Sequence, residues 1–250
     1  MVRVIPVTGL SGSGKTTFIR TLIPLLTRLG PVGTVKHIGH HTMELPEEKD
    51  TTTMFGSGAE AAIGIDQEKM LITLDSTSLA EALDTLSGRG IAFAVVEGYK
   101  SGPLPKIAIG DVNVEACILR NPEPEEVIRS LDRFPSYFTL GEILRELGDE
   151  GGASKEPVTL VTTTIPLPPK SEGNTFSILE RALPRIADET AGRNGVIKVR
   201  AEIQRGALFS RPDELLIAIA GENGDVAAAA LTRVFSRSRE FLEARDIHLL

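Results

Sequence analysis

The sequence predicts an α/β protein in which a mainly parallel sheet is followed by a smaller α+β domain. Over residues 1–148, short apolar runs alternate with segments of helical periodicity, as they do in βαβ units. The run at residues 91–96 is apolar throughout, which is typical of a strand buried on both faces. Beyond residue 157 two strand-like runs follow each other directly, which favours an α+β domain.

The elements of the first domain are predicted in chain order from these patterns. A strand at residues 3–7 precedes a helix at residues 16–29, which has apolar residues three and four apart, contains Pro24 and ends before Gly30. Later strands are predicted at residues 32–35, 61–65, 70–74, 91–96, 106–109 and 114–119. Later helices are predicted at residues 78–86, 123–131 and 140–147, the first of them with Ser78 as its N-cap.

A change of composition separates the two domains. Residues 148–157 read GDEGGASKEP, a stretch without apolar periodicity, so residues 149–156 are predicted to be a linker between domains 1–148 and 157–250. In the second domain, strands are predicted at residues 158–165, 196–204 and 214–220, and helices at residues 176–190 and 225–244.

Bulk composition narrows the classes of function. The net charge of −7 argues against a general nucleic-acid or membrane-surface binder, and no window approaches the ~18 apolar residues of a membrane span. Cys117 is the only cysteine, which excludes an internal disulfide and a four-cysteine zinc site. We therefore expect a cytoplasmic protein that uses neither nucleic acid nor a membrane.

The strongest motif follows the first strand. Residues 9–16 read GLSGSGKT, which fits the phosphate-binding pattern GxxxxGK followed by Ser or Thr. Such a loop folds tightly because of its glycines and turns its N–H groups, together with a helix N-terminus, toward phosphate oxygens. The loop residues expected at the nucleotide are Gly9, Gly12, Ser13, Gly14, Lys15, Thr16 and Thr17. Of these, Lys15 is expected at the β- and γ-phosphates, Thr16 on Mg²⁺ and Thr17 at the α-phosphate.

Two acidic residues are candidates for the catalytic and metal roles. Glu97 ends the apolar strand, and ligand sites of parallel sheets lie at the carboxyl ends of strands. A carboxylate at that position can hold the Mg²⁺ shell or orient a water molecule. Asp50 is a second candidate, although its position along the chain does not by itself favour a site over a solvated acid.

Three histidines crowd the segment KHIGHH. His37, His40 and His41 within five residues suggest a metal site, but no cysteine accompanies them and Gly39 indicates a loop. From the residues alone, a polar loop is the favoured interpretation.

Five motifs together resemble the molybdopterin-guanine dinucleotide biosynthesis protein B family. They are GLSGSGKTT at residues 9–17, VKHIGHH at 35–41, KDT at 49–51, SGAEAA at 57–62 and VEGYKSGPLPKI at 96–107. The resemblance implies a GTP-binding protein that needs Mg²⁺, hydrolyses GTP slowly and forms a homodimer. It also implies an accessory role in attaching a guanine nucleotide to molybdopterin, beside a separate nucleotidyltransferase.

The resemblance also implies roles for individual residues. It places Lys36, His37, His40 and His41 in a loop that faces the active cleft. It makes Asp50 and Glu97 acidic residues of the site, with Lys15 among the catalytic groups, and Lys100 a basic one. Preference for GTP rests on the family alone, because the sequence lacks the NKxD motif by which many GTPases bind guanine.

Residues 157–250 resemble the large subunit of molybdopterin synthase in the order of their helices and strands. Glu222 and Asn223 replace that subunit's His-Arg pair, and its lysine-rich, tryptophan-containing tail has no counterpart here. Synthase activity is therefore not expected, and we expect a domain retained for binding or dimerisation.

Two other functions fit a phosphate-binding loop beside an acidic strand end. A small-molecule kinase would need a substrate lid and acceptor-binding arginines, and residues 1–100 contain only Arg3, Arg20, Arg28 and Arg89. A scaffold that carries cofactor intermediates would bind nucleotide tightly without turnover.

Overall fold

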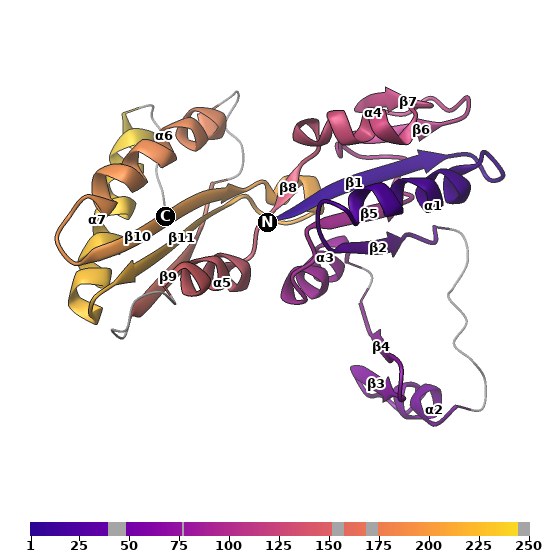
Figure 1. Ribbon diagram of the computed structural model, residues 1–250, viewed down its shortest axis with the longest axis horizontal. Coiled ribbons are helices and arrows are strands. Elements are labelled where there is room, and N and C mark those ends of the chain that lie inside the picture. The colour runs from indigo at the N-terminus through magenta and orange to yellow at the C-terminus, as the bar shows by residue number, and fades with distance from the viewer. Residues whose placement is uncertain (40–48, 77, 152–157, 169–174, 245–250) are drawn as a thin grey trace.

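A computed structural model of the chain describes residues 1–39, 49–76, 78–151, 158–168 and 175–244 (Figure 1). It confirms the predicted α/β class. A mainly parallel sheet lies at one end of an elongated molecule, and a separate three-stranded antiparallel sheet lies at the other. A two-stranded sheet stands apart from both.

The parallel sheet is built around β1 (Val2–Gly9). Its strand order is β2-β5-β1-β6-β7, with β2 at Val32–Lys36, β5 at Phe93–Glu97, β6 at Lys106–Ile109 and β7 at Cys117–Arg120. A short strand, β8 (Ser136–Tyr137), pairs antiparallel with the start of β1. Because β1 has parallel neighbours on both sides, its carboxyl end lies where the chain order of the sheet reverses, which is the usual place for a ligand.

Helices cover both faces of this sheet. On one face α1 (Lys15–Leu26) and α4 (Pro124–Arg129) pack against alternate residues of β1 and its neighbours. On the other face lies α3 (Leu79–Gly88). Its predicted N-cap is confirmed, because the Ser78 side chain accepts a hydrogen bond from the backbone N–H of Glu81 at 3.4 Å.

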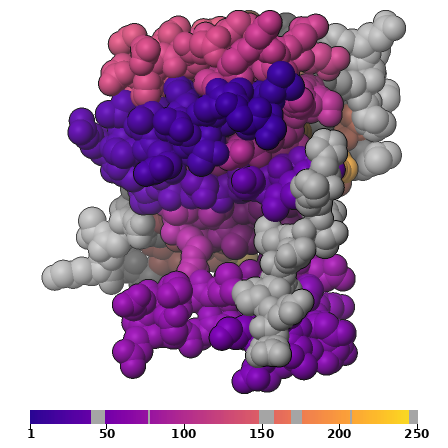
Figure 2. All heavy atoms as spheres, turned by 90° about the vertical axis from the view of Figure 1, so that its right-hand side faces the viewer, coloured from indigo at the N-terminus to yellow at the C-terminus, as the bar shows by residue number. Residues whose placement is uncertain are grey.

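The segment between β2 and α3 forms a separate group. It consists of α2 (Asp50–Gly56), β3 (Ala61–Ile65) and β4 (Met70–Leu74), and β3 pairs with β4 antiparallel. Figure 1 and Figure 2 show this group standing away from the body that contains β1. The two strands were predicted at these residues, but they do not join the parallel sheet.

The C-terminal unit, residues 158–168 and 175–244, contains the antiparallel sheet. Its strand order is β10-β11-β9, with β9 at Thr159–Pro166, β10 at Val196–Gln204 and β11 at Glu214–Gly221. Helices α6 (Thr175–Ala191) and α7 (Gly224–Glu243) cover one face and build the larger core. On the other face α5 (Leu140–Gly151) places Ile143 and Leu147 against Leu216 and Ala218 of β11.

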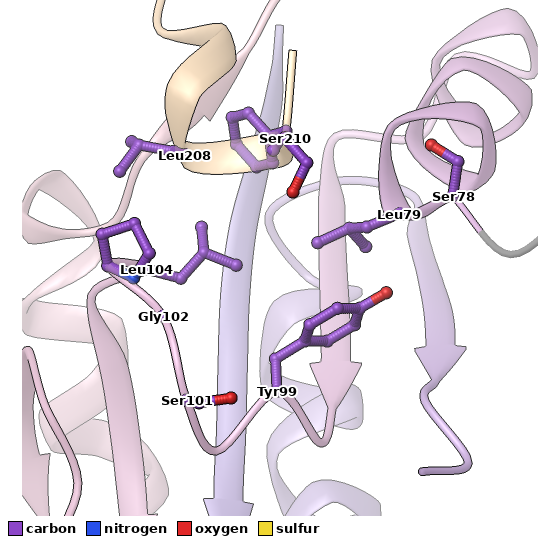
Figure 3. A pocket seen from close by; sticks show the side chains of 10 residues that line it. Ser78, Leu79, Tyr99, Ser101, Gly102, Leu104, Leu208 and Ser210 are labelled. Atoms are coloured by element: carbon purple, nitrogen blue, oxygen red, sulfur yellow. The ribbon is translucent and has the colours of Figure 1, made fainter.

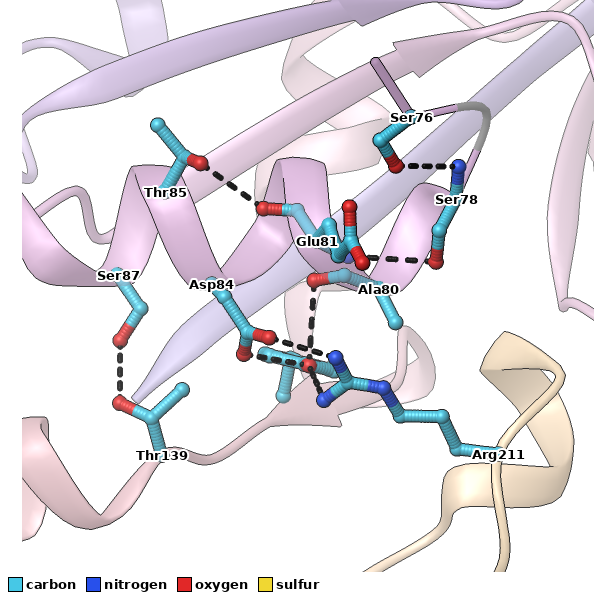
Figure 4. Close-up of polar contacts among 10 residues, drawn as sticks. Ser76, Ser78, Ala80, Glu81, Asp84, Thr85, Ser87, Thr139 and Arg211 are labelled. Atoms are coloured by element: carbon cyan, nitrogen blue, oxygen red, sulfur yellow. Dashed lines mark hydrogen bonds and ion pairs between the residues drawn. The ribbon is translucent and has the colours of Figure 1, made fainter. Parts of the chain in front are cut away.

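A polar and aromatic contact fixes the C-terminal unit against the parallel sheet (Figure 4). Arg211 forms an ion pair with Asp84 of α3 at 2.7 Å, and its guanidinium also donates to the Tyr137 hydroxyl at 3.0 Å. That hydroxyl donates to Asp84 at 2.7 Å, so the three side chains form a closed network. Burial, reinforced by the bond to Asp84, raises the pKa of Tyr137 well above its ordinary value and keeps the phenol neutral.

Element boundaries differ from the sequence predictions where single residues decide the backbone. Helix α1 ends at Leu26 rather than residue 29, and Pro24 lies within it. Strand β7 begins at Cys117 rather than residue 114, because Ala116 has a φ of 51° and interrupts an extended chain. Residues 149–151, predicted as linker, form the end of α5. Neither α2 nor β8 was predicted from the sequence.

Within the part of the chain that the structure describes, no helix is both long enough and apolar enough to cross a membrane.

Candidate functional site

The phosphate-binding motif forms the turn between β1 and α1. Gly12 and Gly14 have φ values of 74° and 90°, a left-handed backbone that glycine adopts at little cost. Gly9 ends β1 so close to β6 that a Cβ there would lie 2.4 Å from the Ile109 carbonyl oxygen. All three glycines are therefore required by the shape of the loop.

The start of α1 is suited to an anion. Gly14 caps the helix without a side-chain hydrogen bond, and the first turn contains no acidic residue. The first backbone N–H groups of a helix have no partner within it, and the helix dipole adds partial positive charge at that end. Lys15 lies across the loop, where its amine donates to the Leu10 carbonyl at 2.5 Å. The hydroxyl-bearing side chains of Thr16 and Thr17 are exposed.

A buried hydroxyl within the loop has no hydrogen-bond partner among the described residues. This is the Oγ of Ser13, and the Oγ1 of Thr8 at the end of β1 is in the same state. Buried polar groups are normally satisfied, so unpaired hydroxyls here fit a site that binds a polar ligand.

Glu97 lies beside the loop at the carboxyl edge of the sheet. It ends β5, and its register partners are Val7 on β1 and Lys36 on β2. Side chains alternate along a strand, and Val95 belongs to the core on the α1 face, so Glu97 projects on that same face. The structure thus places a half-buried carboxylate and the Thr16 hydroxyl at one edge, and this oxygen donor set suits Mg²⁺.

The chain after β5 turns sharply beside His37. Gly98 has a φ of 119°, and a Cβ there would lie 2.9 Å from the Cβ of His37. The backbone N–H of His37 donates to the Glu97 carbonyl at 2.8 Å, and its imidazole stacks on Tyr99 with ring centroids 4.3 Å apart. His37 is therefore held at the same edge as Glu97.

A buried lysine holds the loop that follows Gly98. Lys106 is fully buried on β6, and its amine donates to the carbonyls of Tyr99 at 3.0 Å, Lys100 at 3.2 Å and Gly102 at 3.0 Å. Burial lowers the pKa of Lys106 from its ordinary value, partly offset by Glu115 and Cys117. Three carbonyl acceptors use all three N–H groups of an ammonium, so Lys106 fixes this loop and does not face a ligand.

The remaining predicted residues lie elsewhere. Asp50 opens α2 in the group that stands apart from the parallel sheet, so the structure does not bring it to the phosphate-binding loop (Figure 1). Lys100 is exposed on the loop braced by Lys106. His40 and His41 lie outside the described residues, and among the described residues no cluster of three His, Cys, Asp or Glu could hold a metal ion.

Sequence reasoning missed the structural roles of Tyr99 and Lys106. Both lie in the VEGYKSGPLPKI segment, where the only signal was an isolated lysine at the start of an apolar strand.

In the C-terminal unit, Asn223 caps α7 by accepting a hydrogen bond from the Val226 N–H at 3.0 Å. Its role as a helix cap accounts for an asparagine at residue 223.

Comparison with known proteins adds an independent result. The sequence model of the family "Molybdopterin guanine dinucleotide synthesis protein B" matches residues 4–128, half of the chain. The molybdopterin-guanine dinucleotide biosynthesis adapter protein of Haemophilus influenzae is 35% identical over 117 residues, which are 43% of this chain and 63% of that protein. The adapter protein of Escherichia coli is 30% identical over 119 residues, 44% of this chain and 66% of that protein. The chain thus spans less than two thirds of the length of these relatives.

Among solved structures, the crystal structure of Bacillus subtilis MobB is 21% identical, with a TM-score of 0.43, and the similarity covers 54% of this chain and 99% of that one.

Replacing the buried lysine tests its structural role. We expect Lys106→Met to lower the free energy of unfolding by about 2–4 kcal/mol, because three partly buried carbonyls of the loop lose their charged donor. Urea unfolding followed by circular dichroism measures the change. The matched control is Lys100→Met on the same loop, which removes an exposed amine and should cost less than about 0.5 kcal/mol. Equal losses in the two variants would contradict the assignment.

Proposed function

This chain belongs to the molybdopterin guanine dinucleotide synthesis protein B family, and from that premise we propose that it is a GTP-binding, weakly GTP-hydrolysing accessory protein of molybdopterin guanine dinucleotide biosynthesis. The observation that carries the proposal is the glycine loop at the uncapped start of α1, with Glu97 beside it. Binding guanine rather than adenine nucleotide is inferred from the family, whose relatives are named for a guanine dinucleotide.

The phosphates would be bound by backbone and by Lys15. The unpaired N–H groups of the first turn of α1 would donate to phosphate oxygens, and the helix dipole would favour the negative charge. Lys15 now donates to a carbonyl of its own loop, and the same amine can instead contact the β- and γ-phosphates after a small rotation of its side chain. Thr17, exposed on the same turn, is suited to the α-phosphate.

Thr16 and Glu97 are the residues that would hold Mg²⁺, which supplies positive charge to the terminal phosphates. Glu97 in addition can accept a hydrogen bond from a water molecule and orient it toward the γ-phosphate. Arg20 lies more than one turn into α1 and Arg28 follows the end of that helix, so neither is at the loop. Arg120 donates to the carbonyls of Gly110 and Val112, and Gly110 packs against Ser13 of the loop. The slow rate of hydrolysis is inferred from the family resemblance.

We further propose that the chain acts with a molybdenum cofactor nucleotidyltransferase and with molybdopterin, because the related proteins carry the name adapter. A reducing compartment such as the cytoplasm suits its single cysteine.

Nucleotide titration is the direct test of the binding proposal. We expect calorimetry to show Mg²⁺-dependent binding of a non-hydrolysable GTP analogue, tighter than that of the ATP analogue. Lys15→Ala should weaken binding on the order of 100-fold, because it removes a charge-assisted contact to phosphate. Arg20→Ala, an exposed cation one turn further along α1, is the matched control and should bind as the unchanged chain does. Preference for ATP would favour a kinase instead.

Turnover separates the proposed GTPase from a scaffold. Glu97→Gln keeps the size of the side chain and removes its charge, so we expect GTP binding within a few-fold of normal and hydrolysis reduced roughly 100-fold. Single-turnover release of phosphate, with Glu123→Gln as a control acid outside the site, provides the measurement. If Glu97→Gln hydrolysed GTP at the original rate, Glu97 would be only a strand-end acid.

We also propose a homodimer in which the β3-β4 sheets of two copies face each other. One face of this sheet presents Ile63, Ile65, Met70, Ile72 and Leu74, which share a side because of the register Ile63↔Ile72 and Ile65↔Met70. The opposite face, at Gly64, contacts Thr51 of α2. Ile63 and Ile65 are 54% and 77% exposed, which is unusual for a contiguous apolar surface of a monomer.

Mass measurement by light scattering tests the dimer. The unchanged chain should have twice the mass of one chain, and Ile65→Asp should shift it to a single chain, because a carboxylate cannot be buried there unpaired. Leu160→Asp, at an exposed apolar residue of the C-terminal unit, is the control and should remain dimeric. A single-chain mass for the unchanged protein at all concentrations would overturn the proposal.

A further inference from the structure

A pocket of about 270 Å³ lies between the loop after β5 and the C-terminal unit (Figure 3). Ten residues line it, among them Tyr99, Ser101, Leu104, Leu208, Phe209 and Ser210. In Figure 3, Tyr99 and Ser101 lie on one side of it, and Leu208 and Ser210 lie on the other. The two sides come from segments far apart in the sequence, so the pocket exists only while the C-terminal unit is docked.

Both sides of the pocket are held in place. On one side, Lys106 binds three carbonyls of the loop that bears Tyr99. On the other side, the turn η2 (Gly206–Phe209) is closed by the Arg211 N–H, which donates to the Gly206 carbonyl at 2.9 Å. Arg211 then binds Asp84 and Tyr137 through its side chain (Figure 4). Phe209 is 2% exposed and packs edge-on against Tyr137, with ring centroids 5.0 Å apart. The pocket is therefore largely preformed.

The lining predicts the chemistry of a ligand. Among the ten lining residues, the phenol of Tyr99 is the one ionisable side chain, and burial raises its pKa, so the walls are uncharged at neutral pH. Hydroxyls of serine and tyrosine lie beside leucine, proline and phenylalanine side chains. Such walls suit a neutral, flat heterocycle with polar edges, and a volume of about 270 Å³ holds a bicyclic ring but not an entire nucleotide.

The position of the pocket relative to the phosphate-binding loop separates it from the site of the terminal phosphates. Tyr99 comes two residues after Glu97 and packs on the α3 face of the sheet with Leu104 and Phe209, whereas Glu97 projects on the α1 face. Mg²⁺ binds the terminal phosphates. The phosphate-binding loop leads into α1 on one face of the sheet and the pocket lies on the other, so the pocket is separate from the site of those phosphates.

We propose that this pocket binds the pterin ring of molybdopterin, so that the C-terminal unit completes a second ligand site on the α3 face of the sheet. The choice of a pterin rests on the proposed function. Guanine contains the same 2-amino-4-oxopyrimidine ring, which makes the base of GTP the competing occupant. The C-terminal residues Leu208 and Phe209 lie outside residues 4–128, so this site is a property of the two-unit chain.

Fluorescence of 6-hydroxymethylpterin, a small pterin probe, tests the site. The chain contains no tryptophan, so quenching or a change in anisotropy of the probe is read against a low protein background. We expect saturable binding to the full chain that is unchanged when Mg²⁺ and a non-hydrolysable GTP analogue are present at saturation. Leu208→Glu should weaken probe binding about tenfold or more, because it places a charge in an uncharged pocket. Leu160→Glu, the same change at an exposed leucine of the same unit, should have no effect.

Three results would overturn the proposal: no probe binding, displacement of the probe by the GTP analogue, or equal binding by Leu208→Glu and the unchanged chain. Displacement would assign the pocket to the guanine base. If Leu208→Glu does not fold, Ser101→Glu at the exposed rim places the charge from the other side of the pocket and should weaken binding likewise. Titration with the GTP analogue alone keeps the two hypotheses distinct, because intact GTP binding without pterin binding removes only this inference.

Discussion

The burial of β1 between β5 and β6 is the constraint on which the rest of the molecule depends. Val2, Val4, Ile5 and Val7 are all fully buried, because helices cover both faces of the sheet and parallel strands border both edges of β1. A strand in that position cannot change its register, so the position of the loop that follows it is fixed. The glycine turn, the start of α1 and Glu97 of β5 therefore meet at the carboxyl edge of the sheet.

The same sheet connects the two candidate ligand sites. Glu97 and Tyr99 are separated by Gly98, whose positive φ redirects the chain from the α1 face toward the α3 face. The phosphate-binding loop thus lies on the α1 face and the inter-unit pocket on the α3 face. His37, directly after β2, contacts the turn. Two such sites on one sheet suit the adapter role proposed for this chain, in which one protein binds a nucleotide and a second molecule.

The C-terminal unit contributes to the pocket by docking against the rest of the chain. Its core is formed by α6 and α7 on one face of the antiparallel sheet, while α5 bridges the other face to the remainder of the chain. The Arg211, Asp84 and Tyr137 network is half-exposed at its charged groups, so its value lies in orientation more than in stability. Orientation is what the pocket requires, because η2 supplies one of its walls.

The sequence by itself determined the α/β class, most of the helices and strands, and the phosphate-binding loop. These follow from local rules: apolar periodicity, glycines at fixed spacing, and a carboxylate at the end of an apolar strand. Only the tertiary structure decided that the β3-β4 strands leave the parallel sheet, that Asp50 lies far from the loop, and that Lys106 is a buried brace. It also decided that the C-terminal unit closes a pocket beside Tyr99. Each of these depends on contacts between residues distant in the chain, which no local pattern encodes.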